Sequence, residues 1–141
     1  ELGLIYLLDI NVISELRKGY KADPHVIAWA ASVEASLLFV SVVSIEEIEL
    51  GIRSLCRKDE ASENLMLHWL ENILLPTFSG RILPITLDVV RISAPLHVPN
   101  PGPIRDYLIA ATARAHRMTV ITRDINDFER TGVNLINPWK Q

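Results

Sequence analysis

The segment 103–124 constrains the fold more than any other part of the chain. Its first half places Ile109, Ala110 and Ala113 at helical spacing on one face, and the small alanine side chains let such a helix lie close to a sheet. Residues 118–122 then form a β-branched run, which is typical of a buried strand. A helix that leads through a tight turn into a buried strand indicates an α/β architecture.

Two aspartates bracket this helix and strand. Asp106 lies in the first turn of the predicted helix, and Asp124 follows the predicted strand directly. In a parallel α/β sheet these two ends lie at the same edge, where ligands bind. The segment therefore predicts at least two carboxylates at the ligand-binding edge of the sheet.

Short apolar runs separated by helical patterns recur along the chain. Residues 4–8, 37–43, 81–85 and 133–136 are the further predicted strands, and helical patterns occupy most of the sequence between them. Alternation of this kind implies a mostly parallel sheet with helices on both faces, linked by right-handed crossovers.

Helix signals and breakers divide the segments between the strands. Ser44 and Glu47 have the spacing of a capping box, which predicts a helix that begins after Ser44. A wide apolar stripe over residues 65–74 predicts a long helix. The proline-rich segment 95–103 predicts a surface loop that leads into the helix carrying Asp106.

Length and composition bound the class of protein. The 141 residues suit one domain, 1–141, and no run approaches the roughly 20 apolar residues of a membrane helix. A net charge of −3 argues against a protein that coats nucleic acid but leaves room for a nuclease. The single cysteine, Cys56, excludes an internal disulfide framework and fits a reducing cytosol, so we expect a cytoplasmic protein without membrane contact.

Four acids follow predicted strand ends or begin a helix on the same sheet, namely Asp9, Glu47, Asp106 and Asp124. Each alone has an ordinary explanation as a helix cap or as a partner of the helix dipole. Capping does not explain why all four are predicted at one edge of one sheet. Carboxylates so close together repel one another unless a cation holds them, and an all-oxygen ligand set suits Mg²⁺ or Mn²⁺.

Other site chemistries lack their sequence patterns. The histidines His25, His68, His97 and His116 share no zinc-ligand spacing with Cys56. The six glycines stand singly, so no phosphate-binding or dinucleotide loop is present, and no Ser or Cys lies in a nucleophile elbow.

Four motifs in order give the chain a resemblance to a known family. They are LLDINVISE at 7–15, SVVSIEEIELG at 41–51, VPNP at 98–101 with DYLIAATA at 106–113, and TRD at 122–124 with DF at 127–128. The chain resembles PIN domains, in particular the VapC and FitB type toxins of type II toxin–antitoxin pairs.

The resemblance implies a three-layer α/β/α sandwich of the PIN type and a Mg²⁺- or Mn²⁺-dependent endoribonuclease. In that family Asp9, Asp106 and Asp124 would be metal ligands, and Glu47 would bind through water or position the nucleophile. It also implies a structured RNA substrate such as tRNA or rRNA, a cognate antitoxin that inserts a peptide near the active site, and a homodimer.

Three further residues are expected in supporting roles: Asn11, Ser44 and Asp127, the last as a helper of Asp124. The family usually has Thr after the first Asp, whereas this chain has Ile10. A catalytically weak or silent PIN-like binding module is therefore the alternative. A phosphatase of the haloacid-dehalogenase type, with an aspartyl-phosphate on Asp9, is a further alternative, but its chemistry requires an acid where Asn11 stands. The sequence assigns no RNA-binding residue.

Overall fold

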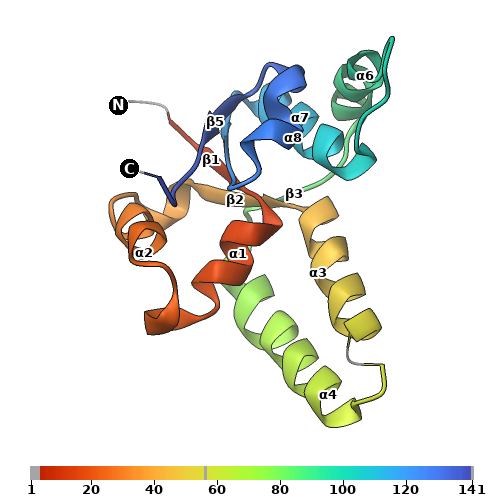
Figure 1. The fold of residues 1–141 in the computed structure, drawn as a ribbon. Coiled ribbons are helices and arrows are strands. Elements are labelled where there is room, and N and C mark those ends of the chain that lie inside the picture. The colour runs from red at the N-terminus through yellow and green to blue at the C-terminus, as the bar shows by residue number, and fades with distance from the viewer. Residues whose placement is uncertain (1–3, 56, 141) are drawn as a thin grey trace.

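The centre of the protein is a five-stranded sheet in which every pair of neighbouring strands is parallel, in the order β3-β2-β1-β4-β5 (Figure 1). The computed structural model describes residues 4–55 and 57–140, so the inference about Cys56 lies outside the described residues. The strands are β1 (Tyr6–Leu8), β2 (Leu38–Ser41), β3 (Ile82–Leu83), β4 (Thr119–Ile121) and β5 (Asn134–Ile136).

Helices fill the segments between the strands. They are α1 (Ile10–Leu16), α2 (Pro24–Ala31), α3 (Val42–Leu55), α4 (Glu60–Trp69), α5 (Leu75–Thr77), α6 (Leu87–Leu96), α7 (Ile104–His116) and α8 (Ile125–Phe128). A π-helical segment, Leu70–Leu74, joins α4 to α5, so the predicted long helix is continuous but irregular. Short 3₁₀ turns lie at Gly19–Lys21, Ala35–Leu37 and Glu129–Thr131. Across the described ranges, no helix has the length and apolar character to cross a membrane.

The sheet separates two apolar cores, which confirms the predicted three-layer α/β/α arrangement. Successive residues of β1 point to opposite faces, so Leu8 joins one core and Leu7 the other. Helices α1, α2 and α4 cover the first face, and α6, α7 and α8 lie on the opposite side (Figure 1). Both cores are therefore built from strands that are buried on two sides, as continuous apolar runs predict.

Helix α7 packs closely on the sheet, as its small residues predict. Ala110 and Ala113 are fully buried and join Leu7 and Val120 in the second core. The helix ends where Arg117 adopts a left-handed conformation with φ 57°, and Met118 then donates a 2.7 Å hydrogen bond to the carbonyl of Ala113. This tight turn sends the chain directly into β4.

Two predicted boundaries were wrong. Helix α3 begins at Val42, directly after β2, so Ser44 lies inside the helix and does not cap it. The hydroxyl of Ser41 accepts a 3.0 Å hydrogen bond from the Val43 amide and takes that role. Helix α6 continues through Pro95 to Leu96, where the prediction placed a loop. A proline so near a helix end disrupts little, because few residues remain beyond it.

Candidate active site

The register of the sheet brings Asp9 and Thr122 together. Leu8 of β1 pairs with Ile121 of β4, so the next residue of each strand leaves the sheet at the same edge. The Asp9 amide donates a 2.9 Å hydrogen bond to the Ile121 carbonyl, and the Thr122 hydroxyl donates a 2.8 Å hydrogen bond to Asp9 Oδ2. The Ile10 amide donates to Asp9 Oδ1 at 2.8 Å. Both oxygens of this buried carboxyl group are thus held in place.

The side chain of Asn11 links the same hydroxyl to Asp124. Asn11 Nδ2 lies 3.2 Å from Thr122 Oγ1 and 3.1 Å from Asp124 Oδ2. The Asp124 amide donates a further 3.0 Å hydrogen bond to Thr122 Oγ1. Asp9, Asn11, Thr122 and Asp124 therefore form one connected network, in which the two carboxyl groups have fixed relative positions.

Glu47 and Asp106 reach the site from helices α3 and α7. Both line a pocket of about 650 Å³, together with Glu46 and Arg105. Arg105 Nη2 lies 3.6 Å from Glu46 Oε1, so this cation is engaged by a carboxylate outside the predicted set. Two of the four predicted acids therefore line a pocket on the side of α3 and α7.

The electrostatics show that the predicted acids share one site. Burial, followed by repulsion from Asp9, Asp127, Glu47 and Asp124, raises the pKa of Asp106 to about 7. Asp106 therefore lies within electrostatic reach of the other three predicted acids and of Asp127.

Asp9 and Glu47 are perturbed in the same direction. Burial raises the pKa of Asp9, and the hydrogen bonds from Thr122 and Ile10 counteract part of that rise. Burial and the charge of Asp9 raise the pKa of Glu47, against the opposing charge of Arg105. Negative charge is thus concentrated here at a cost that a bound cation would relieve.

The donor set fits a hard cation by its chemistry, because it consists of carboxylate oxygens whose charges repel one another. Within the described ranges, no three Asp, Glu, His or Cys side chains converge closely enough to hold a metal ion as they stand. Coordination of one cation by several of these acids would therefore require their side chains to move closer together.

Ser44 is buried one turn before Glu47 on α3. Its hydroxyl is the one fully buried side-chain polar atom without a hydrogen-bond partner among the residues that the structure describes. The predicted cap is thus replaced by an unsatisfied hydroxyl near the acidic centre.

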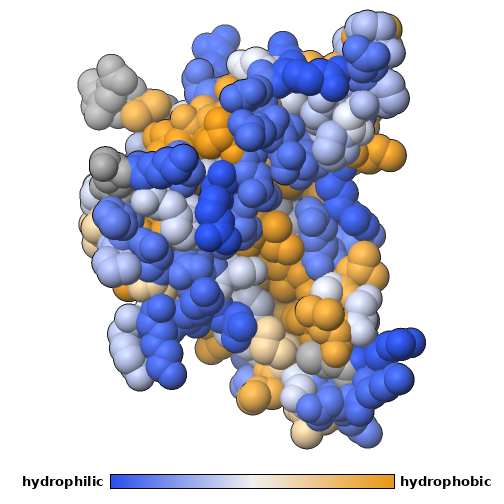
Figure 2. Space-filling model, in the orientation of Figure 1, coloured by the Kyte–Doolittle hydropathy of each residue, from blue (hydrophilic) through white to orange (hydrophobic). Residues whose placement is uncertain are grey.

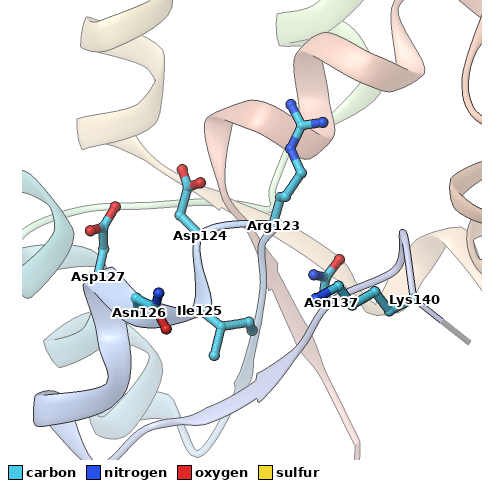
Figure 3. Close-up of a pocket in the computed structure, with 7 residues that line it drawn as sticks. All are labelled: Arg123, Asp124, Ile125, Asn126, Asp127, Asn137 and Lys140. Carbon is cyan, nitrogen blue, oxygen red and sulfur yellow. The ribbon is translucent and has the colours of Figure 1, made fainter.

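A second pocket, of about 290 Å³, adjoins the acids on the side of α8 and the C-terminal segment (Figure 3). Its lining residues are Arg123, Asp124, Ile125, Asn126, Asp127, Asn137 and Lys140. Figure 3 shows the side chains of Arg123, Asp124 and Asp127 rising from this loop on the same side.

An apolar groove runs between α1, α3 and α4 and ends beside Glu47. It encloses about 360 Å³ and is lined mainly by apolar side chains, including Ile10, Ile52, Met66 and Trp69. Figure 2 shows hydrophobic surface gathered between these helices. An apolar groove that adjoins a charged centre is a feature of binding surfaces for other chains.

Sequence reasoning placed the four acids at one edge of the sheet but missed the hydrogen bonds of Thr122. This residue is fully buried, and its hydroxyl forms hydrogen bonds with Asp9, Asn11 and Asp124. The available signal was its position at the end of the predicted strand 118–122, two residues before Asp124. A hydroxyl there is well placed to bridge two strand ends.

A parallel sheet covered by helices on both faces, with carboxylates gathered at the carboxyl edge, defines an α/β protein with a multi-carboxylate centre. The sequence matches the family model of the PIN domain over residues 6–134. It is 36% identical over 141 residues to VapC ribonuclease Y4jK of Sinorhizobium fredii, with 95% of this chain and 97% of that protein covered.

Two further similarities concern FitB of Neisseria gonorrhoeae. Toxin FitB is 36% identical over 138 residues, which cover 94% of this chain and 97% of the toxin. The crystal structure of FitAcB superposes with a TM-score of 0.87 at 34% identity and covers 97% of this chain and 100% of that chain. The chain belongs to the PIN-domain family, with VapC and FitB toxins as homologues, which confirms the resemblance carried by the four motifs.

Proposed function

We propose that this protein is a metal-dependent endoribonuclease. The observation that carries the proposal is the group of acids around Asp106, whose pKa is raised to about 7 by burial and by its acidic neighbours. Such a centre suits hydrolysis of a phosphodiester, and a homologue over nearly the whole chain is named a VapC ribonuclease.

In this proposal Asp9, Asp106 and Asp124 hold Mg²⁺ or Mn²⁺. Such a cation, when bound, lowers the pKa of a coordinated water and offsets negative charge on the phosphodiester. Glu47 orients the attacking water, because its half-buried carboxyl group faces the same space with a raised pKa. Asn11 and Thr122 keep Asp9 and Asp124 in register, and Asp127 adds negative charge at the α8 side.

The presence of Ile10 where the family usually has Thr favours a catalytically silent binding module over an enzyme. Its side chain supplies no hydroxyl beside the centre and lines the apolar groove. Its backbone amide nevertheless holds Asp9 Oδ1, and Thr122 holds Oδ2. Asp9 is therefore supported without a hydroxyl at position 10, which favours the enzyme.

We further infer that the protein is the toxin of a type II toxin–antitoxin pair, acting in the cytoplasm on structured RNA such as tRNA or rRNA. Its homologue FitB is named a toxin. The groove between α1, α3 and α4 offers an apolar binding site for a segment of the antitoxin. One end of that segment would reach the acids beside Glu47. A homodimer completes the proposal, in line with the expectation for this family.

The direct test is RNA cleavage by purified protein. Total RNA and defined tRNA are incubated with Mg²⁺, with Mn²⁺ and with a chelator, and the products are resolved on sequencing gels. Asp9→Asn and Asp106→Asn should abolish metal-dependent cleavage. Asp88→Asn is the matched control, because Asp88 is an exposed acid in the first turn of α6.

Equal cleavage by wild type and both site variants would contradict the assigned centre. Cleavage that continues in the chelator would contradict the proposed dependence on Mg²⁺ or Mn²⁺. Absence of cleavage by a folded, metal-loaded wild type on every RNA tested would favour the silent module.

A further inference from the structure

The guanidinium group of Arg123 lies over the indole ring of Trp139, 4.5 Å from the ring centroid. Trp139 packs against the first apolar core, and its amide donates a 2.9 Å hydrogen bond to Asn137 Oδ1. These contacts hold the indole ring in a fixed position. Stacking holds the guanidinium plane while leaving its N–H edge free to bind an anion.

The side chain of Arg123 is exposed. Of the ion pairs within the described ranges, none involves Arg123 or Lys140. Both residues line the pocket of about 290 Å³ that also contains Asp124 and Asp127. In Figure 3 the Arg123 side chain points to the same side as those two acids.

Lys140 occupies the other wall of this pocket. Its amide donates a 3.2 Å hydrogen bond to the Asn137 carbonyl, which closes a turn within the C-terminal segment. Figure 3 shows the Lys140 side chain extending along Asn137. Two cations without acidic partners therefore border one side of the acidic centre.

A polyanionic substrate needs such cations, because the acids themselves repel it. The centre gathers five carboxyl groups in a protein whose net charge is −3. Arg105, on the opposite side of the centre, is already engaged by Glu46. Arg123 and Lys140, beside Asp124 and Asp127, are therefore available to hold a phosphate backbone.

We propose that Arg123, stacked on Trp139, and Lys140 bind backbone phosphates of the RNA strand next to the bond that is cleaved. The proposal rests on the proposed ribonuclease function and adds the residues that hold the substrate. Arg123 presents two parallel N–H donors to a phosphate, and Lys140 contributes a point charge. Neither contact depends on base sequence, so they anchor the strand and leave target choice to other contacts.

The test measures RNA binding without cleavage. A fluorescein-labelled single-stranded RNA is titrated with the Asp106→Asn protein in chelator, and its anisotropy is followed over a series of NaCl concentrations. Adding Arg123→Gln should weaken binding by about tenfold and reduce the slope of log K against log[salt] by about 0.7, the value for one phosphate on a single strand. Lys140→Gln should give a smaller loss with a similar change in slope.

Two controls separate a phosphate contact from a general loss of charge or fold. Arg117→Gln removes the same charge at the C-terminal end of α7, roughly 16 Å along that helix from Asp106, and should leave binding unchanged. Arg123→Lys keeps the charge but lacks the planar guanidinium group with its parallel N–H donors. Compared with Arg123→Gln, it should restore the salt slope but recover only part of the affinity. Circular dichroism establishes that each variant is folded.

An unchanged dissociation constant and salt slope for Arg123→Gln would overturn the phosphate site. Cleavage of RNA by the wild type in the same preparation would then show that the ribonuclease function stands without it. If the wild type neither cleaves nor binds RNA, the proposed function itself fails, and the phosphate site fails with it.

Discussion

The hydroxyl of Thr122 donates a 2.8 Å hydrogen bond to the carboxyl group of Asp9, which lies 113 residues earlier in the chain. The same oxygen accepts hydrogen bonds from Asn11 and from the amide of Asp124. One buried hydroxyl therefore connects the exits of β1 and β4. The geometry of the acidic centre depends on this contact as much as on the acids.

Replacement of Thr122 by Val keeps the side-chain shape but removes the hydroxyl. Asp9 Oδ2 then loses its donor in a buried position, which should lower the free energy of unfolding by about 1 to 3 kcal/mol. Urea denaturation followed by circular dichroism measures the change. Thr122→Ser retains the hydroxyl and should recover most of the stability; equal losses in both variants would assign the effect to packing.

Asp106→Asn should change the pH dependence of stability. Because the folded pKa of about 7 lies above the ordinary value near 3.8, the folded state binds the proton more tightly, and stability contributed by this group is present below pH 4 and lost as the pH rises through 7. The variant should therefore be more stable than wild type at pH 8, by on the order of 1 to 2 kcal/mol after allowance for solvent screening of a half-exposed group.

Thermal unfolding between pH 5 and pH 8 in chelator tests this pH dependence. The gain of Asp106→Asn over wild type should grow with pH across that range. Asp88→Asn is the control and should show no such trend. A constant difference at every pH would contradict the raised pKa.

Mg²⁺ or Mn²⁺ should stabilise the folded protein. At a free metal concentration ten times the dissociation constant, the gain is about 1.4 kcal/mol, which corresponds to a rise in Tm of roughly 4 °C. The rise in Tm should be smaller at pH 6 than at pH 8, because at pH 6 a proton competes with the metal for the carboxyl group of Asp106. Asp9→Asn should abolish the rise and Asp88→Asn should retain it, as differential scanning fluorimetry would show.

Gly102→Ala should disrupt the loop before α7. A Cβ at this position would overlap the ring of the buried Tyr107, next to Asp106. Overpacking of this kind costs about 1 to 3 kcal/mol, and chemical denaturation measures it. Gly51→Ala is the matched control, because among the described residues nothing outside the adjoining turns of α3 lies within 4 Å of the added Cβ. This substitution should be neutral or stabilise by up to about 1 kcal/mol. Equal destabilisation by both would point away from the Tyr107 contact.

The acids could be predicted from sequence because of a property of parallel sheets. Asp9 and Asp124 follow strands whose carboxyl ends necessarily meet at one edge, so local patterns sufficed to group them. Asp106 could be placed at the same edge because it lies in the first turn of α7, the helix that leads into β4. The fold class was predictable for the same reason, since alternating strands and helices leave few other arrangements.

The rest depends on contacts that no local pattern encodes. Ser44 and Glu47 match a capping box, yet the hydroxyl of Ser41 caps the helix, which begins at Val42 because β2 passes into α3 without a loop. The bridge from Thr122 to Asp9 requires the register of β1 against β4, which is set by packing across the whole sheet. Spacing within a segment cannot reveal either feature.

The central position of β1, between β2 and β4, has a consequence for synthesis of the protein on the ribosome. The first half of the chain contains Asp9 and Glu47 but has no β4 to pair with β1. Asp106, Thr122 and Asp124 emerge only with the last third of the polypeptide. A nascent chain that has not yet reached β4 therefore lacks the complete acidic centre.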